Sequence, residues 1–323
     1  MFGAVVARAI DTWWDDLGRP DPFVVIEAGA GTGTLARTVL AAAPECTAAL
    51  RYVLVERSAV LRQRQGTGLE LELPAFALGP VQWATEDDDQ DPRPVTATGP
   101  LVTSLAEFPA QPFSGVVIAN ELLDNLSFNL LERWDDGWAE LRVGEEGGRL
   151  VELAVPASPD LCDAAEKAAP DAPAGSRVPL QPAAQHWLRD ALAAVPGGRV
   201  VVIDYGDDTP SLARRPWTEW VRTYRGHGRG GHPLDRPGGQ DVTCEVAFDQ
   251  LVAVREPVSR STQREFLVRH GIDALVDDAR RVWAERAGIG DLEAMAARSR
   301  VNEAAALTDP AGLGGFTVVE WTA

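Results

Sequence analysis

The stretch FVVIEAGAGTG, from Phe23 to Gly33, decides the fold expected for this chain. It reads as a buried apolar strand that ends in an acid, then a glycine-rich turn, then the start of a helix. In an open α/β sheet, a nucleoside-containing ligand binds at this kind of strand-to-helix turn. Glycine suits the turn because it adopts positive φ angles and lets the backbone approach a ligand closely.

The spacing of the glycines distinguishes two classes of cofactor. A dinucleotide fingerprint has the pattern G-x-G-x-x-G or A, whereas Gly29, Gly31 and Gly33 alternate and Thr34 occupies the sixth position. Glu27 stands two residues before the first glycine. The resulting E-x-G-x-G-x-G resembles motif I of the S-adenosylmethionine (SAM) dependent methyltransferases. From this motif alone, a dinucleotide site and a glycine turn without a ligand stay open as alternatives.

The composition excludes several classes of partner. The chain has 323 residues, 45% of them hydrophobic, which is enough for one large domain or two ordinary ones. Its net charge is −18 and its isoelectric point is about 4.6, so we expect neither a nucleic acid nor an anionic membrane surface as partner. An acidic surface can instead steer a cationic substrate, although it also serves solubility.

Three cysteines, Cys46, Cys162 and Cys244, lie far apart and lack metal-ligand spacing, so we expect no metal site. Such a sparse, odd set is typical of a reducing compartment. The first residues lack the basic and apolar regions of a signal peptide, and no apolar run reaches membrane-spanning length. These observations predict a cytoplasmic protein and leave its oligomeric state open.

Predicted strands alternate with predicted helices along most of the chain, which favours a parallel, doubly wound sheet. The strands are expected at 23–26, 52–56, 115–120, 199–204 and 316–321, with a further one at either 81–84 or 101–104. The helices are expected at 3–17, 34–43, 59–65, 183–194 and 274–287. We therefore expect a single domain over 1–323, with an insertion of short strands and helices at about 129–197. An irregular, substrate-side segment is expected at about 207–245.

Polar residues follow several of these strands, and ligands of open α/β sheets bind outside the carboxyl ends of strands. Glu56 ends the second strand, where a carboxylate can accept hydrogen bonds from both ribose hydroxyls of SAM or of NAD. Asn120 ends a wholly apolar strand and can reach the tail of a cofactor. Glu121 and Asp124 would share one face if a helix begins there, and could bind a cationic substrate or take a proton. The alternative is a helix cap with first-turn acids that favour the helix dipole.

Two histidines, His227 and His232, lie in a segment rich in glycine, arginine and proline. We interpret them first as flexible surface residues and second as contacts to a substrate. Metal ligation is not expected, because no set of ligands accompanies them.

Six segments occur in an order that is more specific than motif I alone. They are FVVIEAGAGTGTLA (23–36), YVLVERSAVLRQRQ (52–65), VIANELLDNLSF (117–128), VVIDYG (201–206), HGRGGHPLDRPGGQDVT (227–243) and STQREFLVRHGI (261–272). Together they resemble the MidA family of SAM-dependent methyltransferases, over nearly the whole chain. That family includes a mitochondrial arginine methyltransferase needed for the assembly of respiratory complex I.

The resemblance implies a Rossmann-like class I SAM-dependent methyltransferase fold: a mostly parallel, seven-stranded, doubly wound sheet with an inserted segment of short strands and helices. It also implies roles for particular residues. SAM would be held by Glu27, Gly29, Ala30, Gly31, Gly33, Glu56, Arg57 and Asn120. The acceptor would be oriented or deprotonated by Glu121 and Asp124. The substrate side would include Asp204, Tyr205, His227 and Asp241.

The implied reaction is transfer of the SAM methyl group to a nucleophile, foremost an arginine guanidinium of a protein. Carboxylates suit that acceptor because guanidinium forms bidentate pairs with them. Three alternatives remain at this stage: a small-molecule O- or N-methyltransferase, a non-catalytic SAM-binding assembly factor, and a dinucleotide-dependent oxidoreductase.

The sequence departs from the family pattern in places that bear on the acceptor. Asn125 and Ser127 replace the usual alanine and proline, and Glu245 stands where many members have histidine. Family members usually carry a further N-terminal stretch before the helix that starts near Phe2. These differences are expected to affect the choice of substrate.

Overall fold

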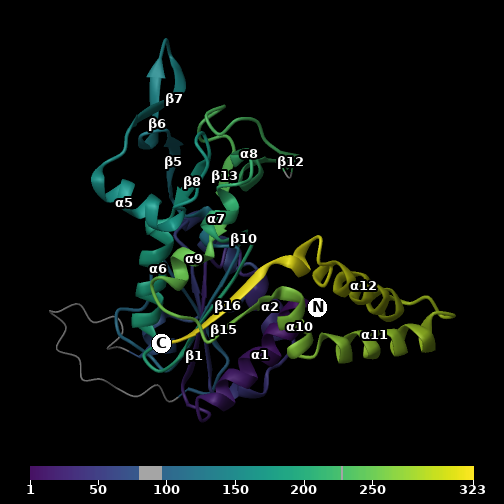
Figure 1. Ribbon diagram of the computed structural model, residues 1–323. Helices are drawn as coiled ribbons and strands as arrows, with labels where there is room; N and C mark the ends of the chain where they lie inside the picture. The colour runs from purple at the N-terminus through teal and green to yellow at the C-terminus, as the bar shows by residue number, and fades with distance from the viewer. Residues whose placement is uncertain (80–96, 227) are drawn as a thin grey trace. The chain divides into compact units, whose positions relative to one another are not determined.

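The computed structural model describes residues 1–79, 97–226 and 228–323 (Figure 1). The chain divides into two compact units. The first comprises Met1–Asn120, Ala191–Ile203 and Pro257–Ala323, and the second comprises Glu121–Asp190 and Asp204–Glu256. The expected single domain over 1–323 stays a prediction. Most of the expected insertion at 129–197 and all of the segment at 207–245 belong to the second unit.

The first unit is built on a mostly parallel sheet, which confirms the predicted fold class. Among the described residues it has seven strands in the order β15-β16-β9-β4-β1-β2-β3. The strands are β1 (Phe23–Ala28), β2 (Leu50–Val55), β3 (Leu101–Leu105), β4 (Gly115–Asn120), β9 (Arg199–Asp204), β15 (Ser259–Thr262) and β16 (Thr317–Thr322). Strand β1 pairs in parallel with β2 and β4, β2 with β3, and β4 with β9, while β15 and β16 are antiparallel.

Helices flank this sheet, and most of them lie where the sequence predicts them. They are α1 (Phe2–Asp16), α2 (Thr34–Ala41), α3 (Ala59–Gln65), α4 (Pro74–Leu78), α10 (Gln263–Arg269), α11 (Ile272–Arg286) and α12 (Leu292–Leu307), with α6 (Pro182–Ala194) running from the second unit into the first. Short 3₁₀ turns occur at η1 (Glu45–Ala48) and η4 (Leu313–Gly315).

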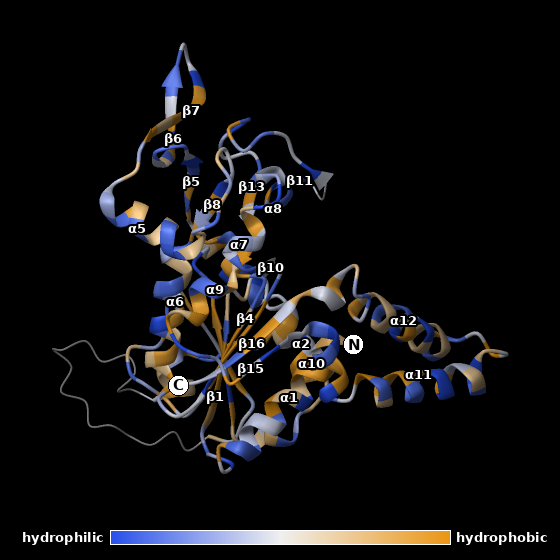
Figure 2. Cartoon of the chain, in the orientation of Figure 1, coloured by the Kyte–Doolittle hydropathy of each residue, from blue (hydrophilic) through white to orange (hydrophobic). Residues whose placement is uncertain are grey.

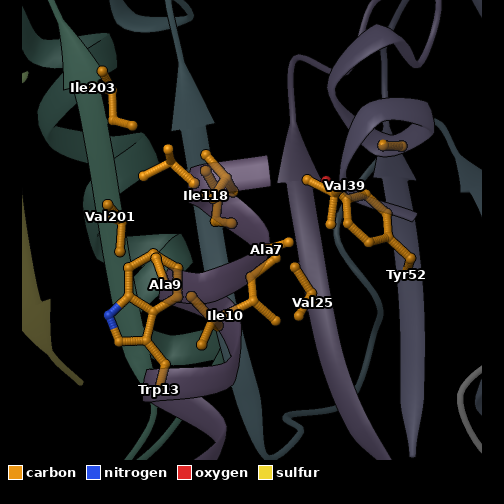
Figure 3. Packing of buried hydrophobic residues seen from close by; sticks show 14 of the residues in the cluster. Ala7, Ala9, Ile10, Trp13, Val25, Val39, Tyr52, Ile118, Val201 and Ile203 are labelled. Atoms are coloured by element: carbon orange, nitrogen blue, oxygen red, sulfur yellow. The ribbon is translucent and has the colours of Figure 1, made fainter. Parts of the chain in front are cut away.

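Helix α1 packs its apolar face against the sheet, which explains its helical periodicity. Ile10 and Trp13 of α1 are buried and lie beside Val25, Ile118 and other strand residues in one core cluster (Figure 3). Because both faces of β1 and β4 are covered, these strands are apolar along nearly their whole length (Figure 2). Packing in this core therefore fixes the positions of the strand ends that carry Glu27 and Asn120.

Some elements differ from the sequence prediction. The third strand is β3, while the competing segment 81–84 lies outside the described residues. Helix α12 was not predicted, because its alanine-rich sequence, LEAMAARSRVNEAAAL, has no continuous apolar stripe. It packs antiparallel to α11 (Figure 1), and Asp291 caps it by accepting a hydrogen bond from the Ala294 amide.

The second unit holds three further sheets among its described residues: β7-β6-β5-β8, β12-β11-β13 and β10-β14. The strands are β5 (Asn129–Trp134), β6 (Gly137–Glu146), β7 (Arg149–Pro156), β8 (Arg177–Leu180), β10 (Gly206–Asp207), β11 (Val221–Arg225), β12 (Gly228–Arg229), β13 (Asp241–Cys244) and β14 (Val246–Ala247). The helices are α5 (Pro159–Ala168), α7 (Thr209–Leu212), α8 (Trp217–Trp220) and α9 (Phe248–Val252), with a 3₁₀ turn η3 (Leu123–Asn125).

The segment at 207–245 is more regular than predicted. Strands β11 and β13 pair antiparallel from Val221–Cys244 to Tyr224–Asp241. Trp220 is fully buried and donates its indole N–H to the Leu212 carbonyl at 3.1 Å. The glycines and prolines suggested an irregular loop, but this tryptophan anchors a small core of its own with Leu212 and Cys244. Among the described residues, no helix of the molecule is long and apolar enough to span a bilayer.

Candidate functional site

The glycine-rich turn after β1 has the conformation that its sequence predicts. Gly29, Gly31 and Gly33 all have positive φ, at 70°, 53° and 75°. The amides of Gly29 and Ala30 donate to the Val55 carbonyl at 2.9 and 3.1 Å, which attaches the turn to the end of β2. A Cβ on Gly33 would lie 2.9 Å from Leu69 Cδ1, whereas the space beside Gly31 is open to 4 Å. The turn is therefore packed on one side and accessible to a ligand at Gly31.

Glu56 connects the turn to the end of β2. Its Oε2 accepts a hydrogen bond from the Gly31 amide at 3.0 Å, and its Oε1 accepts one from the Ser58 amide at 2.8 Å. Each carboxylate oxygen has two lone-pair directions, so both oxygens can accept a further hydrogen bond. A pair of vicinal ribose hydroxyls fits this acceptor, and the open space at Gly31 fits the approach of the ligand. The residues present are consistent with SAM.

Gln65 is a residue of this site that sequence analysis did not single out. It lies at the end of α3, is fully buried, and donates its Nε2 to the Gly31 carbonyl at 2.8 Å. Its Oε1 accepts a hydrogen bond from the Ser104 hydroxyl of β3 at 2.5 Å. The side chain thus joins the glycine turn to the neighbouring strand. A signal existed in the sequence, since Gln65 ends the L-R-x-x-Q part of the second matching segment.

Replacing Gln65 with leucine is expected to lower the free energy of unfolding by about 2 kcal/mol, because it leaves two buried polar partners unsatisfied. The affinity for S-adenosylhomocysteine is expected to fall as well, since Gly31 loses its support. Urea unfolding and isothermal titration calorimetry measure the two effects. Unchanged stability would contradict the role given to Gln65, and the exposed neighbour Arg64 provides a control as Arg64→Leu.

Glu27 is buried rather than open to solvent. It is 5% exposed, and Tyr52 Oη donates a hydrogen bond to its Oε2 at 2.8 Å. Burial raises the pKa of Glu27 to about 7, and the hydrogen bond from Tyr52 partly opposes this shift. Glu27 therefore supports the end of β1 from within the core, and its contact with SAM stays a prediction.

The raised pKa of Glu27 has a consequence for stability. Between its ordinary value of 4.5 and the folded-state value of about 7, the folded protein keeps a proton that the unfolded chain releases. Stability is therefore lost as the pH rises through this window, by about 3 kcal/mol from this group. Glu27→Gln is expected to remove that loss. Urea unfolding of both proteins from pH 4.5 to 8 tests this, and parallel pH profiles would contradict it.

The remaining cofactor-binding predictions differ in exposure. Ala30 is buried in the turn, Arg57 is exposed just after β2, and Asn120 is half-buried at the end of β4. The Arg57 carbonyl accepts a hydrogen bond from Arg62 at 2.8 Å, so its backbone is held by α3. The structure thus brings the turn, Glu56 and Gln65 together by direct hydrogen bonds, while binding roles for Arg57 and Asn120 stay predictions.

In the second unit, Asp204 organises the backbone around it. Asp204 is fully buried; its Oδ2 accepts hydrogen bonds from the amides of Leu123 at 3.0 Å and Asp124 at 3.3 Å, and its Oδ1 accepts one from the Tyr205 amide at 2.9 Å. Direct contact of Asp204 with a substrate was expected. Because the carboxylate has no exposed surface and is turned toward three amides, we assign it a positioning role instead.

Asp124 is the acid that this arrangement holds. It is 4% exposed; its Oδ2 accepts a hydrogen bond from Tyr205 Oη at 2.6 Å, and its Oδ1 accepts one from Asn125 Nδ2 at 2.6 Å. Tyr205 Oη also lies 2.9 Å from Thr243 Oγ1. Burial raises the pKa of Asp124, and the hydrogen bonds from Tyr205 and Asn125 oppose the shift. A buried carboxylate with a raised pKa suits proton acceptance near neutral pH.

No regular helix begins at Glu121, so the condition under which Glu121 and Asp124 would share one helical face is not met. Glu121 is exposed with a φ of 51°, in the left-handed region, and only the short 3₁₀ turn η3 follows it. The amides of Leu123 and Asp124, which both donate to Asp204, hold this turn. Positive φ is uncommon for a residue with a side chain and often marks a functional loop. A catalytic role for Glu121 stays a prediction.

The other substrate-side predictions are placed as follows. Tyr205 is brought together with Asp124, as described. Asp241 is exposed at the start of β13, opposite Tyr224 of β11. His227 lies outside the described residues. Glu245, which stands where many family members have histidine, is 5% exposed. It accepts hydrogen bonds from both Arg215 and Arg222.

Comparisons with known proteins bear on this site. A family model described as "Putative S-adenosyl-L-methionine-dependent methyltransferase" matches residues 5–264. The chain belongs to this family. The match confirms the resemblance to the MidA family. It also favours SAM over a dinucleotide as the cofactor, because the family is described as SAM-dependent. A dinucleotide-dependent oxidoreductase is therefore not supported.

Similar proteins agree with the methyltransferase family. The mitochondrial protein arginine methyltransferase NDUFAF7 of Xenopus tropicalis is 25% identical over 291 residues, covering 84% of this chain and 63% of the relative. The Drosophila melanogaster homologue is 26% identical over 268 residues, covering 79% and 58%. The chain thus spans about 60% of the length of these relatives. A crystal structure of a COG1565 superfamily member from Burkholderia thailandensis, bound to S-adenosyl-homocysteine, has a TM-score of 0.77 at 25% identity, covering all of this chain and 76% of that one.

Proposed function

We propose that the chain binds SAM through the first unit and transfers its methyl group to an arginine guanidinium of a protein. The observation that carries the proposal is the buried Asp124 carboxylate. Tyr205 donates a hydrogen bond to this carboxylate, and the backbone amide of Asp124 donates one to Asp204. A buried carboxylate that accepts charge-assisted hydrogen bonds suits a guanidinium better than a neutral acceptor. The names of the relatives from Xenopus and Drosophila support arginine as the acceptor.

The residues of the glycine turn would hold the cofactor. Glu56 would accept hydrogen bonds from the ribose hydroxyls, and Gly31 lets the backbone approach closely because no side chain fills the space beside it. Gln65 keeps the turn in this conformation. When bound, SAM supplies an electrophilic methyl group on a sulfonium sulfur.

The residues present can account for each bond change and for the proton released at the acceptor. A carbon–nitrogen bond to the guanidinium forms as the carbon–sulfur bond breaks, and the guanidinium nitrogen loses one proton. We assign the Asp124 carboxylate to orient the guanidinium and accept this proton, with Tyr205 orienting the carboxylate through its hydrogen bond. Alignment of the nucleophile contributes most of the rate enhancement in such displacements.

Two measurements test the proposal separately. Isothermal titration calorimetry with S-adenosylhomocysteine and with NADH tests the cofactor site, and we expect binding of the former only. Methyl transfer from labelled SAM to arginine peptides, followed by mass spectrometry, tests the acceptor. Incorporation of methyl groups into a matched lysine peptide or into small amines instead of arginine would overturn the choice of acceptor. Binding without any transfer would favour the non-catalytic assembly factor.

Two further proposals concern the partner of the protein and its location in the cell. A protein is the proposed partner, consistent with the names of the relatives and with the acidic surface of a chain of net charge −18. A cytoplasmic location is proposed from the sparse cysteines, and fractionation of the native cells would test it.

A further inference from the structure

A cavity of about 460 Å³ in the second unit is lined by three arginines, Arg225, Arg229 and Arg236, together with Gly230 and Gly231. Among the described residues, none of these three guanidinium groups makes an ion pair with an acid, and all three residues are exposed. Elsewhere in the same unit, arginines such as Arg215 and Arg222 are paired with buried acids. The chain has 48 acids and 30 basic residues, so acids are available to pair with most of its arginines. A cluster of unpaired arginines in such a chain indicates a binding site for an anion.

The wall of this arginine pocket is held by hydrogen bonds within the loop after β12. The Gly230 amide donates to the Thr223 carbonyl at 2.8 Å, and Thr223 Oγ1 donates to the Gly231 carbonyl at 2.7 Å. Gln240 Nε2 donates to the His232 carbonyl at 2.8 Å. The one acid in the described lining, Asp235, accepts a hydrogen bond from the His232 amide at 3.1 Å. The loop is thus fixed by its own contacts, and the arginines are left for a ligand.

The same small sheet carries both this pocket and the support of Asp124. Arg222 of β11 lies opposite Thr243, whose hydroxyl contacts Tyr205, and the Arg222 guanidinium stacks over the Tyr205 ring at 5.4 Å. Two residues further along β11, Tyr224 lies opposite Arg229 of the pocket. A strand rises about 3.3 Å per residue and neighbouring strands lie about 4.8 Å apart, so Arg229, which is on the other side of β11 from Thr243, lies about 12 Å from it.

We propose that the arginine pocket binds an oxyanion of the protein acceptor, a carboxylate or phosphate carried three or four residues from the methylated arginine. This inference rests on the proposed function. An extended peptide advances about 3.3 Å per residue, so an arginine at Asp124 brings the third or fourth residue beyond it within reach of Arg229. Guanidinium groups bind either oxyanion bidentately. A nucleic acid is disfavoured, because the net charge of the chain repels a polyanion.

Binding is measured first, because it does not depend on turnover. Three labelled peptides carry one arginine, followed at the third and fourth positions by two glutamates, two glutamines or two phosphoserines. Their dissociation constants are measured by fluorescence anisotropy in the presence of S-adenosylhomocysteine. The pocket variant is Arg229→Gln/Arg236→Gln. The control is Arg149→Gln/Arg189→Gln, which removes the same charge from exposed arginines of the same unit.

We expect the glutamate peptide to bind about tenfold more tightly than the glutamine peptide, through two charge-assisted contacts of modest strength in solvent. The preference should disappear in the pocket variant, persist in the control, and weaken as salt is raised. A phosphoserine peptide that binds at least tenfold more tightly than the glutamate peptide identifies phosphate as the oxyanion; otherwise carboxylate is the oxyanion. Equal binding of the three peptides, or a preference that survives in the pocket variant, overturns the inference.

Methyl transfer to the same peptides separates this inference from the proposed function. If both stand, the pocket variant raises KM for the glutamate peptide about tenfold and leaves kcat unchanged. If every peptide is methylated with one KM, the pocket inference fails and the proposed function survives. If no peptide is methylated but the glutamate preference depends on the pocket, the pocket stands and arginine methylation fails.

Discussion

Replacing Asp124 with asparagine is expected to lower kcat for methyl transfer by a factor of about 100 to 10,000, the usual range for a lost proton acceptor. The asparagine is nearly the same size and can still accept the hydrogen bond from Tyr205, so the fold should persist. It cannot take a proton, and it no longer pairs with a guanidinium. Because the glycine turn and Glu56, and not Asp124, are the residues assigned to the cofactor, the dissociation constant of S-adenosylhomocysteine should stay unchanged.

The pH profile gives a second readout of Asp124. Its pKa is raised by burial, so kcat should increase with pH through a value above the ordinary range of aspartate. The hydrogen bond from Tyr205 lowers that pKa, so Tyr205→Phe should move the rise to higher pH. Asp135→Asn, in an exposed turn, is the control for loss of an acid in the same unit. Full turnover by Asp124→Asn would exclude the proposed role.

Replacing Glu56 with alanine is expected to weaken the binding of S-adenosylhomocysteine about 100-fold or more. The change removes the acceptor proposed for the ribose hydroxyls, and hydrogen bonds to a charged group contribute about 1.5–3 kcal/mol each. It also releases the amides of Gly31 and Ser58, so the turn loses its connection to the end of β2. Isothermal titration calorimetry measures the effect directly.

A graded set of variants makes the Glu56 result interpretable. Glu56→Gln keeps one carbonyl acceptor and should fall between the wild-type protein and Glu56→Ala. Glu70→Ala removes an exposed acid from the same unit and should bind normally. Similar affinity for all three variants would show that the cofactor does not reach Glu56. Circular dichroism of each variant establishes that the fold is retained.

The first unit was predictable from sequence because its signals are local and periodic. Apolar runs such as GVVIAN, at 115–120, identify strands that are buried on both faces. The alternating glycines and Glu27 identify the turn, since positive φ strongly favours glycine. The matching segments added the cofactor, which spacing alone had left open between SAM and a dinucleotide.

The acceptor region was less predictable because its geometry depends on contacts between residues far apart in sequence. Asp204 binds the amide of Asp124 across 80 positions, and this contact helps to hold the short 3₁₀ turn that carries Asp124. Gln65 ends one of the matching segments, but its hydrogen bond to Gly31 is a contact across 34 positions that the sequence does not show. The strand β11 was hidden by flanking glycines and prolines, which commonly indicate loops.

The hydrogen bonds that Asp204 accepts suggest how acceptor choice can change without loss of activity. The turn that presents Asp124 is held through backbone amides, which every residue except proline provides. The exposed side chain of Ser127 is therefore free to differ between relatives, whereas Asn125 donates a hydrogen bond to Asp124 and belongs to its support. An engineer could vary Ser127 to redirect the enzyme, provided that Asp204, the two amides and Asn125 are preserved. Selection in nature can follow the same route, one surface residue at a time.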